Sequence, residues 1–276
     1  MSPDEYCAQR VAKAGSSLYY ALLYLQKEKR RAVTAVHAFA REVEDTVDEC
    51  SDSSLARVKL AWWRSQVASI YEGLPQHPVA LALRPAAKTF DLKEESFQEI
   101  IEGVEKDLAR SSYPDFNALT DYCRSTGGAV SSLCAEIFGY EDERTRFHAR
   151  DMGFAIRLAQ VLRDVGKSAR RGVIHLPLDD MVRFGVTPAE VLRRRSTPEF
   201  AELIRFQADR AEQQLSAAAS GIPAVDRNAH RLTLILGAIQ RTILGEIRGD
   251  PDCVLDRQVD LTPLRKLWIA WRVGRS

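Results

Sequence analysis

The fold is decided by the stretch Ala38-Phe39-Ala40-Arg41-Glu42-Val43-Glu44-Asp45-Thr46-Val47-Asp48-Glu49. It lies within residues 28–72, a segment that contains neither proline nor glycine. Val36, Ala40, Val43 and Val47 recur at helical spacing, which predicts one buried helix face. Five of the nine residues in 41–49 are acidic. We therefore predict a long amphipathic helix that carries a cluster of carboxylates.

Helical patterns continue along the rest of the 276-residue chain. Asp52 or Ser53 is the expected N-cap of the next helix, which Gly73 and Pro75 should end. Residues 172–177, bounded by glycine and proline, are expected to be extended. The other expected helices cover residues 78–88, 94–109, 116–138, 142–167, 198–219 and 226–248. Because the connections are short and no linker is visible, we predict one all-α domain over residues 1–276.

Composition excludes several classes of protein. The net charge of +1 gives no reason to expect a nucleic-acid partner. Five cysteines without a C-x-x-C pair argue against a disulfide framework or a zinc site. The polar start and the absence of an 18-residue apolar run predict a cytoplasmic protein with reduced thiols. No phosphate-binding loop, dinucleotide fingerprint or Ser-His-Asp arrangement is visible in the sequence.

The acids of the first helix suggest metal binding. Glu44 and Asp48 are four residues apart, so their carboxylates share one helix face and repel each other. A divalent cation such as Mg²⁺, which prefers oxygen ligands, would relieve that repulsion. The alternative is a solvated helix end with surplus acid. The apolar neighbours Val43 and Val47 place the pair at the edge of the core, where a carboxylate needs a partner.

A second polar stripe lies on the helix expected at 142–167. Arg157, Gln160, Asp164 and Ser168 share one face of an otherwise apolar helix, which indicates a cavity or a buried polar network. Ordinary amphipathicity of a half-exposed helix is the alternative. Basic residues follow at Lys167, Arg170 and Arg171. They suit a diphosphate ligand, although cations are also favoured at helix C-termini.

Residues 38–49 and 154–172 resemble the two Asp-rich signatures of the squalene/phytoene synthase family. Further segments match the family in the expected order, over about residues 4–275: 15–20, 60–64, 75–78, 113–116, 135–140, 162–166, 169–172 and 174–177. The resemblance implies the isoprenoid synthase fold, a helical bundle around a central apolar cavity. Residues 62–64 and 135–140 favour the bacterial presqualene diphosphate synthases of hopanoid and squalene biosynthesis.

This resemblance implies head-to-head condensation of two farnesyl diphosphates to presqualene diphosphate, assisted by Mg²⁺. Glu44, Asp48 and Asp164 are the implied metal ligands, and together with Tyr122 they are the implied catalytic residues. The implied substrate-binding residues, all polar or cationic, are Ser16, Ser17, Arg41, Arg157, Gln160, Arg163 and Arg171.

The same signatures depart from the family pattern. Both signatures are Asp-x-x-x-Asp in the family, whereas this chain has Glu44 in the first and Ser168 in the second. Lys167 stands where an acid is common in the family. Arg157 and Gln160 replace a Gln–Asn pair, and His37 and His175 each replace a tyrosine. The pocket face becomes more positive, so Mg²⁺ is expected in reduced number or not at all. Two hypotheses follow: an active synthase with a modified metal site, or a weak or inactive relative that binds a prenyl diphosphate or a protein partner. Another prenyl-diphosphate reaction is a minor third.

Two features remain open from the sequence. The basic, aromatic helix expected at 263–272 could lie on the surface of the inner membrane, although docking on the protein core is the commoner explanation for such a helix. Aromatic residues could line the cavity and stabilise a carbocation, or they could belong to the ordinary core: Tyr19, Tyr20, Phe39, Tyr122 and Phe154. Substrate chain length and oligomeric state are not fixed by the sequence.

Overall fold

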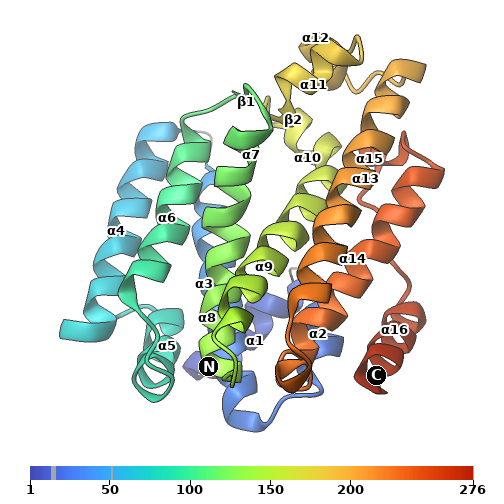
Figure 1. The fold of residues 1–276 in the computed structure, drawn as a ribbon. Helices are drawn as coiled ribbons and strands as arrows, with labels where there is room; N and C mark the ends of the chain where they lie inside the picture. The colour runs from blue at the N-terminus through green and yellow to red at the C-terminus, as the bar shows by residue number, and fades with distance from the viewer. Residues whose placement is uncertain (14–16, 51, 276) are drawn as a thin grey trace.

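The computed structural model describes residues 1–13, 17–50 and 52–275. Long helices run side by side and form the body of the molecule (Figure 1). They are α3 (Lys27–Asp48), α4 (Ser53–Glu72), α6 (Glu94–Leu108), α8 (Ala129–Phe138), α9 (Arg144–Arg163), α13 (Pro198–Gly221) and α14 (Arg231–Gly249). The predicted all-α fold is confirmed.

Shorter elements close the two ends of this bundle. At one end are α1 (Pro3–Lys13), α2 (Ser17–Leu22), α5 (Pro78–Thr89) and α16 (Pro263–Arg275) (Figure 1). The opposite end carries α10 (Val165–Arg170), α11 (Leu178–Arg183), α12 (Pro188–Leu192) and α15 (Cys253–Asp256). The helix α7 (Phe116–Cys123) and the single turns η1 (Arg124–Gly128) and η2 (Ala224–Asp226) complete the helices.

The local sequence explains most helix boundaries. Asp52 caps α4 by accepting hydrogen bonds from the amides of Ser54 and Leu55 at 2.8 and 3.4 Å. The expected extended segment is β2 (Ile174–Pro177), which pairs in parallel with β1 (Ser112–Tyr113). This short pairing ties the end of α6 to the segment that follows α10.

Two expected helices are interrupted where the site forms. The helix expected at 116–138 contains η1, a turn of π-helix at residues 124–128. The helix expected at 142–167 breaks at Asp164, where φ is −98° and ψ is 14°. The helix expected from residue 226 starts at Arg231, as α14, because residues 224–226 form a 3-10 turn. Breaks of this kind depend on tertiary contacts, which helical periodicity does not report.

Glycines let η1 approach α9 closely. A Cβ added to Gly153 would lie 2.2 Å from the carbonyl oxygen of Gly127. A Cβ on Gly127 would lie 2.4 Å from the carbonyl oxygen of Gly153 and 2.5 Å from Cβ of Arg157. The contact therefore sets the position of Arg157, one turn after Gly153.

We expect Gly153→Ala to lower the free energy of unfolding by about 2–3 kcal/mol, because the added methyl group must push two backbones apart. Gly245→Ala is the matched control, since nothing lies within 4 Å of the Cβ it would add to α14. That control should gain up to about 1 kcal/mol from helix propensity. Urea unfolding of both variants measures the difference, and equal stabilities would contradict the close crossing.

The C-terminal helix α16 packs against α14 and α2. Ile269 and Ala270 are buried, so docking on the core is confirmed. The opposite face exposes Leu264, Leu267, Trp268 and Trp271. Contact of this face with a membrane stays a prediction. In the described part of the chain, no helix is long and apolar enough to cross a membrane.

Candidate functional site

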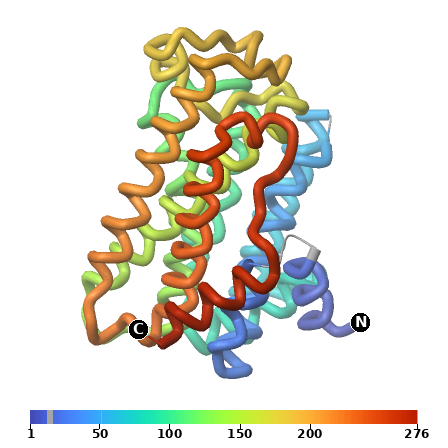
Figure 2. Tube along the Cα trace, turned by 90° about the vertical axis from the view of Figure 1, so that its right-hand side faces the viewer, coloured from blue at the N-terminus to red at the C-terminus, as the bar shows by residue number. Residues whose placement is uncertain are grey.

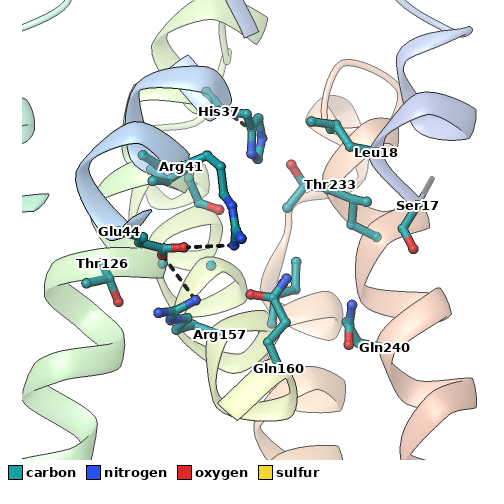
Figure 3. A pocket seen from close by; sticks show the side chains of 18 of the residues that line it. Ser17, Leu18, His37, Arg41, Glu44, Thr126, Arg157, Gln160, Thr233 and Gln240 are labelled. Carbon is teal, nitrogen blue, oxygen red and sulfur yellow. Dashed lines mark hydrogen bonds and ion pairs between the residues drawn. The ribbon is translucent and has the colours of Figure 1, made fainter. Parts of the chain in front are cut away.

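A cavity of about 250 Å³ lies between α3, α9, α14 and the segment that leads to α16 (Figure 3). This volume is slightly below that of typical ligand sites, which span roughly 300–1,000 Å³. The lining residues are Val11, Ser17, Leu18, His37, Ala40, Arg41, Glu44, Thr126, Gly127, Val130, Ser131, Cys134, Gly153, Ile156, Arg157, Gln160, Arg163, Asp164, Leu232, Thr233, Leu236, Gln240, Gln258 and Asp260. Charged side chains gather at one side of the cavity, where Arg41 and Arg157 both face Glu44 (Figure 3).

Cations hold the two carboxylates of the first acidic motif. Oε1 of Glu44 lies 3.1 Å from a guanidinium nitrogen of Arg157, and Oε2 lies 3.8 Å from Arg41. Oδ1 of Asp48 accepts from Arg171 at 2.5 Å, and Oδ2 accepts from the amine of Lys167 at 3.1 Å. These contacts join the end of α3 to α9 and α10.

The negative charge of Asp164 is likewise balanced by a neighbouring cation. Its two oxygens accept from Arg163 at 3.0 and 3.1 Å, and Gln258 donates to Oδ1 at 3.0 Å. Burial opposes the charge, but Arg163 outweighs it and the pKa of Asp164 falls below its ordinary value. Gln258 comes from the segment after α15, which runs along the bundle to α16 (Figure 2). The hydrogen bond from Gln258 to Asp164 therefore ties this C-terminal segment to the end of α9.

All six oxygens of these three carboxylates thus have cationic neighbours. Mg²⁺ needs anionic oxygens that are free to coordinate it. In the described residues, no three His, Cys, Asp or Glu side chains are grouped so that they could hold a metal ion. With the charges paired as they are, the residues do not fit a cluster of several Mg²⁺ ions.

Arg157 connects the cavity to a buried tyrosine. Its guanidinium donates to the Tyr122 hydroxyl at 2.5 Å and lies over the ring, 5.3 Å from the centroid. Although burial disfavours the charge, Glu44 and Tyr122 raise the pKa of Arg157 further, so it stays charged. Burial also raises the pKa of Tyr122, which therefore stays protonated. Tyr122 lies behind Arg157, outside the cavity lining.

Behind Tyr122 lies a Ser-His-Asp network that the sequence did not reveal. Nδ1 of His175 is 3.0 Å from Oγ of Ser168, and Nε2 is 3.0 Å from Oδ1 of Asp107. Tyr113 donates to the same Asp107 oxygen at 2.5 Å. The sequence could not show this network, because α10, β2 and α6 meet only in the folded chain. Ser168, His175 and Asp107 are all buried and do not line the cavity, so the network joins elements rather than presenting a nucleophile.

Several departures from the family pattern are partners of one another or of retained acids. Arg157 pairs with Glu44, both of them departures. Ser168 contacts His175, again both departures. Lys167 pairs with the retained Asp48. These altered residues therefore satisfy one another's polar groups or those of a retained acid.

Part of the inner wall of the cavity is polar and uncharged, and it lies among apolar lining residues such as Leu232 and Leu236. His37, Gln160, Thr233 and Gln240 point toward the cavity (Figure 3). Desolvation lowers the pKa of His37 to about 4, so its ring is neutral near pH 7. Thr233 and Gln240 lie seven residues apart on α14 among apolar residues. That spacing was the signal by which the sequence could have identified them.

The sequence left open whether aromatic residues line the cavity or belong to the core. Among the lining residues that the structure describes there is no Phe, Tyr or Trp. Phe39 and Phe154 are buried in the core, whereas Tyr19 is 59% exposed. Tyr20 packs against the core from a partly buried position. The alternative interpretation, that these residues are not carbocation-binding groups, agrees better with their positions.

The predicted substrate-binding residues divide into three groups. Five of them line the cavity: Ser17, Arg41, Arg157, Gln160 and Arg163. Arg171 does not line it and instead holds Asp48. Ser16 lies outside the described residues. Gln258 and Asp260 line the cavity although the sequence analysis did not select them, because no local pattern marks a loop that folds back over a distant helix.

Comparisons with known proteins agree with this geometry. The Squalene/phytoene synthase family profile matches residues 11–265. The phytoene synthase of Mycobacterium tuberculosis (strain ATCC 25618 / H37Rv) is 33% identical over 264 residues, covering 93% of this chain and 85% of that protein. The phytoene synthase of Arthrospira platensis is 29% identical over 276 residues, covering 95% and 89%.

Solved structures show the same fold. A dehydrosqualene synthase bound to a ligand superposes with a TM-score of 0.89 at 24% identity, covering 99% of this chain and 95% of that chain. Squalene synthase HpnC from Alicyclobacillus acidocaldarius superposes with a TM-score of 0.77 at 25% identity, covering 90% and 93%. From the family match over most of its length, the chain belongs to the squalene/phytoene synthase family of head-to-head prenyltransferases.

Proposed function

We propose that this protein binds a prenyl diphosphate, farnesyl diphosphate being the first candidate, and holds the diphosphate with arginines instead of several Mg²⁺ ions. Turnover is then slow or absent. The observation that carries this proposal is the pairing of every oxygen of Glu44, Asp48 and Asp164 with a cation. Members of the family bind prenyl diphosphates, which sets the class of ligand.

The cations that would meet the diphosphate already line the cavity. Arg41, Arg157 and Arg163 face it from α3 and α9. Arginine binds phosphate oxygens through charge-assisted, often bidentate hydrogen bonds. A diphosphate entering this end would exchange places with the carboxylates that now occupy these guanidinium groups.

Low turnover follows from two further features. Without several metal ions, the departing diphosphate would lack the Lewis-acid stabilisation that Mg²⁺ supplies. Without aromatic rings, the wall also lacks the groups that stabilise an allylic cation electrostatically. The chain therefore keeps more of the groups that would bind a prenyl diphosphate than of the groups that would promote its cleavage to an allylic cation.

A second candidate is the condensation of two farnesyl diphosphates to presqualene diphosphate with Mg²⁺. It is favoured by the placement of Glu44 and Asp48 on α3 and of Asp164 at the end of α9, where acids of both motifs remain. This candidate requires the bound diphosphates to take over the arginines and free the carboxylates for metal.

Glu44→Gln distinguishes the two candidates. If arginines hold the diphosphate, the variant should bind farnesyl diphosphate about tenfold more tightly in calorimetry without Mg²⁺, because Arg157 loses its competing carboxylate. If the metal site works, the variant should bind more weakly and lose Mg²⁺-dependent product, measured by mass spectrometry. Glu49→Gln, an exposed change at the end of the same helix, is the control for net charge. No binding of farnesyl diphosphate to the wild-type protein would refute the proposal.

A further inference from the structure

One buried amide on the cavity wall lacks a partner. The side chain of Gln240 is on the cavity-facing side of α14, and the residue is 2% exposed. Among the residues that the structure describes, Oε1 of Gln240 has no hydrogen-bond partner. A buried polar group without a partner costs free energy, and native proteins satisfy nearly all such groups with protein, water or a ligand.

The neighbours of Gln240 indicate what kind of group would satisfy it. Thr233 is 4% exposed and lies two turns earlier on the same helix. Gln160 and His37 face the same space from α9 and α3 (Figure 3). His37 is neutral near pH 7, and burial raises the pKa of the neighbouring Cys134 thiol to about 12. This wall therefore offers neutral donors and acceptors and no charge.

The two sides of the cavity thus favour different chemistry. The side with Arg41, Arg157 and Arg163 suits an anion. The side with Thr233 and Gln240 suits an uncharged polar group, whereas a plain hydrocarbon would leave the amide unsatisfied. A hydroxyl group both donates and accepts, so it fits either orientation of the Gln240 amide.

We propose that the ligand is an amphiphile with a diphosphate head and a hydroxyl group on its hydrocarbon part, and that Gln240 binds this hydroxyl. Only the diphosphate head of this ligand rests on the proposed function; the hydroxyl site does not. It adds a specificity-determining contact that separates hydroxylated isoprenoids from plain prenyl chains.

The test uses calorimetry without Mg²⁺ on the full chain. The probes are farnesyl diphosphate and three derivatives, each with one hydroxyl group on a different isoprene unit. The best derivative should bind the wild-type protein about tenfold more tightly than farnesyl diphosphate. Gln240→Met, which keeps the length of the side chain but removes the amide, should abolish this advantage. Gln213→Met, an exposed change on α13, should preserve it.

The outcomes separate this inference from the proposed function. If farnesyl diphosphate binds but no derivative binds more tightly, or if the advantage survives in Gln240→Met, cavity water satisfies the amide and the inference is overturned. The corresponding farnesols, which lack diphosphate, form a second arm. If no diphosphate binds, but a hydroxyfarnesol keeps a Gln240-dependent advantage over farnesol, the hydroxyl site stands and the proposed function fails. Thermal melting checks folding, and Gln240→Met should melt no lower than wild type, because it removes an unsatisfied buried group.

Discussion

The triple variant Arg157→Gln, Gln160→Asn and Ser168→Asp should raise Mg²⁺-dependent conversion of farnesyl diphosphate to a C30 diphosphate by at least about a hundredfold. Arg157→Gln frees Glu44 from its ion pair at 3.1 Å. Ser168→Asp adds a carboxylate one turn after Asp164, at a buried position that does not itself line the present cavity. Together the changes move the site by two negative charges, which favours Mg²⁺. Mass spectrometry of products across a Mg²⁺ series measures the effect.

Arg150→Gln is the matched control for this variant. Arg150 also lies on α9 and donates to a carboxylate, Glu99, at 3.1 Å, but it does not line the cavity. Its replacement should leave turnover unchanged. A folded triple variant that binds farnesyl diphosphate and yields no product would mean that the paired charges are not what limits catalysis. A wild-type protein that is already as active as the variant would establish the modified metal site as a working one.

Asp107→Leu should lower the free energy of unfolding by about 4 kcal/mol. Oδ1 of Asp107 is the acceptor for both His175, at 3.0 Å, and Tyr113, at 2.5 Å. Leucine fills a similar volume but leaves both buried groups without an acceptor, at about 1–3 kcal/mol each. Asp107→Asn is the control, because its carbonyl oxygen can accept both bonds, and it should lose about 1 kcal/mol. Urea unfolding at pH 7 separates the two, and equal losses would contradict the network.

The same carboxylate should give the wild-type protein an acid-dependent loss of stability. Burial raises the pKa of Asp107, but the hydrogen bonds from His175 and Tyr113 outweigh it, and the net pKa is lowered. A group with a lowered folded-state pKa stabilises the protein above its unfolded pKa of about 4 and loses this effect as the pH falls further. Unfolding measured between about pH 3 and pH 6 should therefore be steeper below pH 4 for wild type than for Asp107→Asn.

The sequence by itself determined the helices and the acid-rich face of α3. Helical periodicity and the i, i+4 spacing of Glu44 and Asp48 are local properties, so they can be read from neighbouring residues. The cap at Asp52 and the extended segment before Pro177 are local for the same reason. Three members of the predicted polar stripe, Arg157, Gln160 and Asp164, line the cavity. The fourth, Ser168, does not, because the helix breaks at Asp164.

Only the tertiary structure decided which charges meet. Glu44 and Arg157 are 113 positions apart in the chain, and the crossing of α9 with η1 at Gly153 and Gly127 fixes where Arg157 lies. The Asp107–His175–Ser168 network joins α6, β2 and α10, and Gln240 faces the cavity from α14. Hydrogen bonds and ion pairs act over a few ångströms. Their partners are therefore set by how the helices pack and not by the order of residues along the chain.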